Sequence, residues 1–213
     1  MMTLWGRKNS INVQKVLWCL AELGLEEKRD FTRIDAGLEY GVNKSPEYLK
    51  MNPNGLVPVL QDGDLILWES HTIMRYLAKK YDSQVRFSKD AGIQAASEKW
   101  MDWKLSTLWP TLRVAFLGLM RTPEPERNYE AIKKSFADSD KLLGMIDITL
   151  ADRPYLSGQS FELGDMCIAL GVNRWVSLSN LHPDICPRTD YKNIAKWYQQ
   201  IQEKTLFQIT QQT

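Results

Sequence analysis

Short apolar runs alternate with amphipathic segments in the N-terminal part of this chain. Thr3-Leu4-Trp5 is a strand candidate, and Gly6 to Ile11 forms a polar loop after it. The segment from Asn12 to Leu23 then repeats apolar residues at helical spacing and is followed by Gly24, a residue common just past a helix end. This pattern predicts a first strand that leads into a first helix.

Two further apolar runs, Val57 to Leu60 and Leu65 to Trp68, are separated by Gln61-Asp62-Gly63-Asp64. Such a turn between two runs of this length is typical of a β-hairpin. Ser70 follows at a position suited to an N-cap, and the apolar spacing after it predicts a helix to Tyr81. The N-terminal region is therefore predicted to be mixed α/β.

After Tyr81 the pattern changes from strands and helices to helices alone. Residues 82–88 form a polar linker, and helical spacing continues beyond it, with a bend expected near Pro110. We therefore predict an α/β domain over residues 1–81, a linker over 82–88 and an all-helical domain over 89–213.

One of the later helices begins with an unusual residue. The capping position is occupied by Glu162, three residues before Asp165, and Phe161 and Met166 are placed to pack as a hydrophobic staple. Because Glu is a poorer cap than Ser, the sequence predicts that Glu162→Ser stabilises the fold by about 0.5–1 kcal/mol.

Charge and hydropathy exclude several classes of protein. The formal net charge is +1 without a long basic run, which argues against nucleic acid as the main partner. No apolar stretch approaches the roughly 20 residues of a membrane span. The polar start Arg7-Lys8-Asn9-Ser10 does not fit a signal peptide, so we expect a cytoplasmic protein.

The cysteines argue against disulfide and metal chemistry. Cys19, Cys167 and Cys186 are odd in number, far apart in the sequence and unaccompanied by a Cys-x-x-Cys pair. No cluster joins them to His71 or His182. We therefore predict no metal site, no bound cofactor and no dithiol redox centre.

The step from Val57 to Pro58 is suited to binding a peptide. A cis bond is inexpensive before proline, and it would turn the backbone N–H and C=O of Val57 outward to pair with an extended peptide. The helix beginning at Ser70 would favour a carboxylate at its N-terminus. The alternatives are an ordinary edge-strand proline and an ordinary cap.

Ser10 and Asn12 lie where the first strand gives way to the first helix, a usual location for chemistry in such a unit. Unpaired backbone N–H groups and the positive end of the helix dipole favour an anion there, including a thiolate. The alternative for Asn12 is that it only caps the helix.

These residues resemble the cytosolic glutathione transferase family, closest to its bacterial theta-like members. The most specific part is the sequence Asn-Pro-x-Gly-x-Val-Pro at residues 52–58, followed by a hairpin and Glu-Ser-x-x-Ile-x-x-Tyr-Leu from Glu69. Leu56 departs from the Lys or Gln that many members carry before the Val-Pro step. The resemblance covers nearly the whole chain and implies a thioredoxin-like domain of order βαβαββα followed by an all-α domain.

The resemblance also implies roles for individual residues. Ser10 matches the catalytic hydroxyl that stabilises the thiolate of glutathione, with Asn12 as its competitor. Substrate binding would fall to Val57 and Pro58 at the cysteinyl unit, to Glu69 and Ser70 at the γ-glutamyl end, to Asn54 at the glycyl end, and to Asp102 reaching across a homodimer. The helical domain would form the electrophile side of a cleft.

Three functions remain open on the sequence alone. The first is a transferase that conjugates glutathione, its co-substrate, to a small hydrophobic electrophile in detoxification. The second is a glutathione-dependent disulfide or peroxide reductase, and the third is a non-catalytic binding protein with the same fold.

Overall fold

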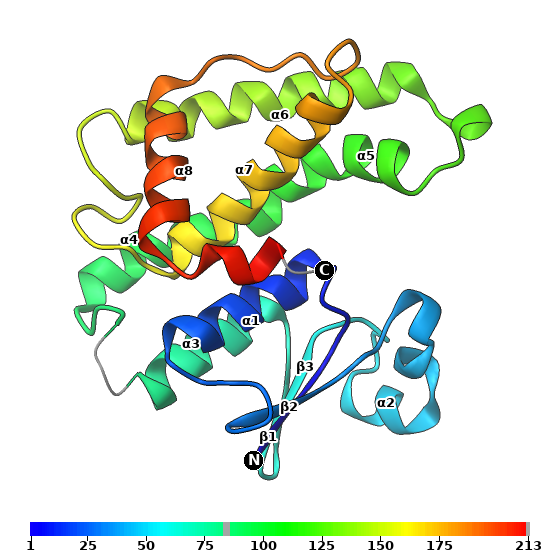
Figure 1. Cartoon of the computed structure of the whole chain (residues 1–213), viewed down its shortest axis with the longest axis vertical. Helices are drawn as coiled ribbons and strands as arrows, with labels where there is room; N and C mark the ends of the chain where they lie inside the picture. The colour runs from blue at the N-terminus through cyan, green and yellow to red at the C-terminus, as the bar shows by residue number, and fades with distance from the viewer. Residues whose placement is uncertain (83–85, 212–213) are drawn as a thin grey trace. The chain divides into compact units, whose positions relative to one another are not determined.

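A computed structural model describes residues 1–82 and 86–211 of the chain, which are drawn in Figure 1. The chain divides into two compact units, the first formed by Met1–Phe87 and Lys204–Thr213 and the second by Ser88–Glu203. Of the predicted linker 82–88, residues 83–85 lie outside the described residues. The second unit ends earlier than the predicted helical domain 89–213, since the end of the chain belongs to the first unit.

The end of the chain joins the first unit because it packs on helix α1 (Ile11–Glu22). A short 3-10 helix, η5 (Phe207–Gln211), places Phe207 edge-on against Trp18, with ring centroids 5.1 Å apart. The side chain of Gln14 donates to the backbone oxygen of Thr210 at 2.9 Å. These contacts join residues almost two hundred positions apart, which local periodicity does not reveal.

The sheet of the first unit has the order β2-β1-β3-β4. Strand β1 (Met2–Trp5) is parallel to β2 (Phe31–Ile34) and antiparallel to β3 (Val59–Asp62), which forms a hairpin with β4 (Leu65–Trp68). The predicted hairpin is confirmed, but β3 runs to Asp62 and the turn is shorter than predicted. Gly63 supplies the positive φ, 61°, that a tight hairpin turn requires.

Helices flank this sheet. Helices α1 and α3 (Ser70–Tyr81) pack side by side, and α2 (Pro46–Met51) lies on the other side of the strands (Figure 1). The first unit also contains the 3-10 turns η1 (Leu38–Tyr40) and η2 (Val42–Lys44). The predicted order βαβαββα is confirmed, and with it the thioredoxin-like N-terminal fold.

The second unit is helical throughout its regular structure, as predicted. Among the described residues, no helix combines the length and the apolar character that crossing a membrane requires. The elements of the second unit are α4 (Ala91–Trp103), η3 (Lys104–Leu108), α5 (Trp109–Met120), η4 (Glu124–Glu126), α6 (Tyr129–Thr149), α7 (Leu163–Leu181) and α8 (Lys192–Lys204).

The irregularity expected near Pro110 occurs one turn earlier. The five-residue element η3 is a π-helical turn between α4 and α5, and Pro110 lies in the first turn of α5. Proline has no N–H for the carbonyl four residues before it, so the backbone around Ser106 must depart from regular α-helix.

The start of α7 is organised around two buried carboxylates. One oxygen of Asp165 accepts from the backbone N–H of Leu156 at 2.9 Å and from the indole of Trp197 at 3.0 Å, and the other accepts from the N–H of Glu162 at 3.1 Å. Burial raises the pKa of Asp165 to about 7, and the three N–H donors offset that cost. A capping box between Glu162 and Asp165 therefore forms as the sequence predicts.

Glu162 does more than cap the helix, and this reverses one expectation. Its side chain is buried, and its carboxylate accepts from the backbone N–H of Ser88 at 3.1 Å and from the hydroxyl of Ser160 at 3.0 Å. Serine is too short to reach the Ser88 amide, so the predicted stabilisation by Glu162→Ser does not fit the structure.

We now expect Glu162→Ser to lower the free energy of unfolding by about 1–3 kcal/mol, because it leaves the half-buried N–H of Ser88 without its acceptor. Glu162→Gln is the matched control, since its amide oxygen still reaches Ser88, and a smaller loss is expected. Urea titration followed by circular dichroism measures both. An unfolding free energy that is unchanged or higher in Glu162→Ser would restore the original expectation.

Candidate functional site

Segments far apart in the sequence line one small cavity in the first unit, with a volume of about 40 Å³. Its walls come from the start of α1, from the loop before β3 and from the step between β4 and α3. The structure thereby brings together most of the predicted site residues. The lining residues are Asn12, Asn52, Asn54, Leu56, Val57, Pro58, Glu69 and Ser70.

The loop over residues 52–58 is held by the buried amide of Asn52. Its Oδ1 accepts from the backbone N–H of Asn54 at 3.1 Å and from the Asn54 side-chain amide at 2.9 Å. Its Nδ2 donates to the backbone oxygen of Leu56 at 2.9 Å. The resemblance assigns Asn52 no role of its own, although the Asn-Pro pair at residues 52–53 is a turn signal that indicates a structured loop here.

Helix α2 also holds this loop, through the side chain of Tyr48. The hydroxyl of Tyr48 donates to the backbone oxygen of Leu56 at 2.7 Å, and burial raises the pKa of Tyr48, so that this donor keeps its proton. Val57 packs against the cluster of Ala36, Tyr48 and Val59. The Val57–Pro58 bond is cis, which is the arrangement suited to peptide binding that the sequence analysis left open beside an ordinary edge-strand proline.

The prediction that Ser70 is an N-cap is wrong by one residue. Helix α3 begins at Ser70, and Glu69 occupies the cap position with a φ of 70°. A positive φ in a residue other than glycine costs on the order of 1–3 kcal/mol and is a feature of binding and active sites. Ser70 is consequently the first helical residue, among backbone N–H groups that have no partner within the helix.

Ser10 and Asn12 take different positions at the start of α1. Ser10 is buried and is the N-cap residue, but its hydroxyl makes no capping hydrogen bond to the helix. Asn12 is exposed and lines the cavity as the second residue of the helix. The alternative that Asn12 caps the helix is therefore excluded, whereas Ser10 does not line the cavity itself.

Asp102 is the second predicted site residue, after Ser10, that does not line the cavity. It is an exposed residue near the end of α4, in the second unit, and it does not line this cavity. Within residues 1–82 and 86–211, no group of three or more His, Cys, Asp or Glu side chains is arranged to hold a metal ion.

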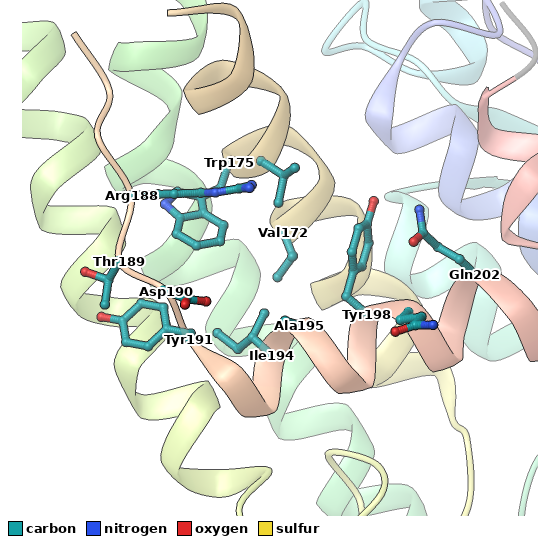
Figure 2. A pocket seen from close by; sticks show the side chains of 12 residues that line it. Val172, Trp175, Arg188, Thr189, Asp190, Tyr191, Ile194, Ala195, Tyr198 and Gln202 are labelled. Atoms are coloured by element: carbon teal, nitrogen blue, oxygen red, sulfur yellow. The ribbon is translucent and has the colours of Figure 1, made fainter. Parts of the chain in front are cut away.

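Larger hollows occur outside this site. One of about 370 Å³ lies in the second unit between α7 and α8, where Arg188 lies over the ring of Trp175 at 5.7 Å (Figure 2). Another, of about 410 Å³, lies in the first unit beside α1 and η5. Neither contains a predicted site residue. The small cavity is the better candidate because amide groups, a carboxylate and a helix N-terminus converge there.

Comparison with known proteins gives consistent matches. The profile of the glutathione S-transferase N-terminal domain matches residues 1–79, and that of the glutathione S-transferase C-terminal domain matches residues 107–204. The chain is 43% identical over 206 residues to glutathione S-transferase GstB of Escherichia coli K12, covering 96% of this chain and 94% of GstB. It is 33% identical to glutathione S-transferase F10 of Arabidopsis thaliana, over 67% of this chain and 68% of that protein.

A solved structure is similar over the full length. The theta class glutathione S-transferase of Xanthomonas axonopodis pv. citri, crystallised with glutathione bound, superposes with a TM-score of 0.88 at 37% identity. The match covers 100% of this chain and 97% of that one.

The Asn52 hydrogen bonds predict how the loop responds to substitution. Asn52→Ala leaves the Leu56 oxygen and the Asn54 N–H each with one partner fewer, so we expect the free energy of unfolding to fall by about 1–3 kcal/mol. Asn54→Ala is the control, because Asn54 is exposed and a change within about 0.5 kcal/mol is expected. Equal effects of the two substitutions in urea titrations would show that Asn52 does not hold the loop.

Proposed function

This chain belongs to the glutathione S-transferase family, and on that premise we propose that it binds glutathione across the residues that line the small cavity, stabilises its thiolate and conjugates it to a hydrophobic electrophile. The observation that carries the proposal is the convergence of Asn12, Val57 and Ser70 on one cavity. Each supplies a different kind of contact, which suits a ligand with an amide backbone, a carboxylate and a thiol.

The proposed peptide contacts follow from the chemistry of the lining. We assign the backbone of Val57 to the cysteinyl unit, because an extended peptide pairs with outward N–H and C=O groups. The start of α3 at Ser70 suits the γ-glutamyl carboxylate, and the Glu69 carboxylate suits the adjacent α-amino group. Asn54 is assigned to the glycyl end, and its exposed position on the loop supports that role.

The energy needed to ionise the bound thiol is modest. A free thiol has a pKa of about 8.5, so half-ionisation at pH 7 requires about 2 kcal/mol in favour of the thiolate. A hydrogen bond to a charged acceptor is worth about 1.5–3 kcal/mol. The unengaged capping hydroxyl of Ser10 and the exposed amide of Asn12 are each able to supply one such bond.

The cysteines of the chain bear on the competing reductase function. Cys19, Cys167 and Cys186 are all buried, and no disulfide joins any two of them, as suits a reducing cytoplasm. Their burial means that in either reaction the sulfur chemistry falls to bound glutathione. We prefer conjugation, because the family relatives that match this chain over most of its length carry the transferase name.

We also propose that the protein is a homodimer, with Asp102 contributing to the glutathione site of the partner. Strand β4 is an edge of the sheet, and it exposes Leu65, Ile66 and Trp68. An exposed apolar edge strand promotes aggregation unless another protein surface packs on it. A two-fold dimer interface is the commonest arrangement among soluble oligomers and would bury this strand.

The assignment of the thiolate donors is tested with bound glutathione. We expect Ser10→Ala and Asn12→Ala each to raise the pKa of the bound thiol by about one unit, since one hydrogen bond to sulfur is lost. Thiolate absorbance, titrated against pH, measures this shift, and the larger rise identifies the principal donor. An unchanged thiol pKa in both variants would remove these residues from the mechanism.

Turnover distinguishes the possible functions. The wild-type protein is expected to conjugate glutathione to a chlorinated nitroaromatic compound, with reduced kcat/KM in the variant that raises the thiol pKa most. Reduction of a small mixed disulfide without conjugation would favour the reductase. Absence of glutathione binding by the folded wild-type protein in calorimetry would favour a non-catalytic role.

The proposed dimer is tested by charging the exposed edge. Leu65→Lys is expected to shift the protein from dimer to monomer in sedimentation experiments, because a buried unpaired charge disfavours the interface. Ile148→Lys is the control, since Ile148 is a comparably apolar, exposed residue on α6. A wild-type protein that sediments as a monomer would contradict the dimer, and with it the role of Asp102.

A further inference from the structure

A buried lysine lies directly behind the start of α3. Lys15, on α1, is 1% exposed, and its Nζ lies 3.0 Å from the hydroxyl oxygen of Ser70 and 2.9 Å from Nε2 of His71. Burying an ammonium group is costly unless it is compensated. The side chain of Lys15 therefore lies directly behind a residue that lines the cavity.

The hydrogen-bond roles follow from the chemistry of the ammonium group. It has three donors and no acceptor, so both Ser70 Oγ and His71 Nε2 must accept from it. His71 is consequently the tautomer without a proton on Nε2. The Ser70 hydroxyl, fixed as an acceptor by Lys15, keeps its own proton available for a second group.

The charges around the cavity have a defined arrangement. Lys15 places a positive charge within hydrogen-bond distance of Ser70, where the N-terminus of α3 already favours anions. Glu69, the neighbouring residue, lines the same cavity with a carboxylate. A zwitterionic α-amino-acid group, with its carboxylate toward Ser70 and its ammonium toward Glu69, matches this separation of charge.

We propose that Lys15 is a positioning residue for recognition of the ligand's α-carboxylate. It holds Ser70 as a hydrogen-bond donor to that carboxylate and supplies the positive charge behind it, without touching the ligand. The inference rests on the proposed binding of glutathione in this cavity. It adds that discrimination against ligands without the α-carboxylate depends on Lys15, a buried residue behind the site, as well as on the residues that line the cavity.

The test compares two ligands by isothermal titration calorimetry: glutathione and the analogue 4-aminobutanoyl-cysteinyl-glycine, which lacks only the α-carboxylate. We expect wild-type protein to bind glutathione at least about 10-fold more tightly than the analogue. In Lys15→Met this ratio is expected to fall to about 2 or less, while the affinity for the analogue changes by less than about 3-fold. Lys15→Gln, a neutral polar variant, is measured alongside and replaces Lys15→Met if that protein does not fold.

Two further variants separate positioning from other effects. Lys79→Met, which removes an exposed lysine on α3, is expected to keep the wild-type ratio and controls for net charge. In a Ser70→Ala background, loss of Lys15 is expected to change the ratio no further, because Lys15 acts through Ser70.

The outcomes are distinguishable. An equal loss of affinity for both ligands in Lys15→Met would mean that Lys15 only supports the fold, and a ratio that stays at the wild-type value would mean that it has no part in recognition. Either result overturns the inference while leaving glutathione binding intact. Failure of the wild-type protein to bind glutathione would instead overturn the proposed function.

Discussion

The amide of Asn52 is the contact on which the shape of the candidate site depends. A buried side-chain amide must satisfy its donors and acceptor, and Asn52 does so with groups of the loop that follows it. The Leu56 carbonyl is fixed from two directions, by Asn52 and by Tyr48. Because both ends of the loop are held, Val57 and Pro58 are presented at a fixed place beside α3 rather than on a mobile turn.

A similar arrangement occurs in the helical unit. Asp165, at the start of α7, ties the loop residue Leu156, the cap residue Glu162 and the indole of Trp197 to one carboxylate. In both units a single buried polar side chain connects a loop to regular structure. Local sequence accounts for part of this, since a residue and its neighbours three or four positions away satisfy each other, as in the capping box of α7.

The sequence predicted the fold class and most residues of the cavity, because apolar periodicity and turn residues are local signals. It misplaced the start of α3, since Glu69 takes a positive φ that its residue type does not indicate. It misjudged Glu162, whose partner at Ser88 is 74 positions away. The burial of Lys15 was equally hidden, because its partners Ser70 and His71 lie on another helix. Long-range polar contacts were thus the part that periodicity did not reveal.

The burial of the cysteines bears on how well the protein resists alkylation by its own substrates. An enzyme proposed to bring thiol-reactive compounds next to an activated sulfur risks alkylation of its own side chains. Here Cys19, Cys167 and Cys186 are all buried within their units, so an electrophilic substrate would meet the sulfur of the bound peptide before it met a cysteine of the protein. In the proposed reaction the bound tripeptide is consumed and replaced at each turnover, whereas the buried cysteines of the protein are shielded from alkylation.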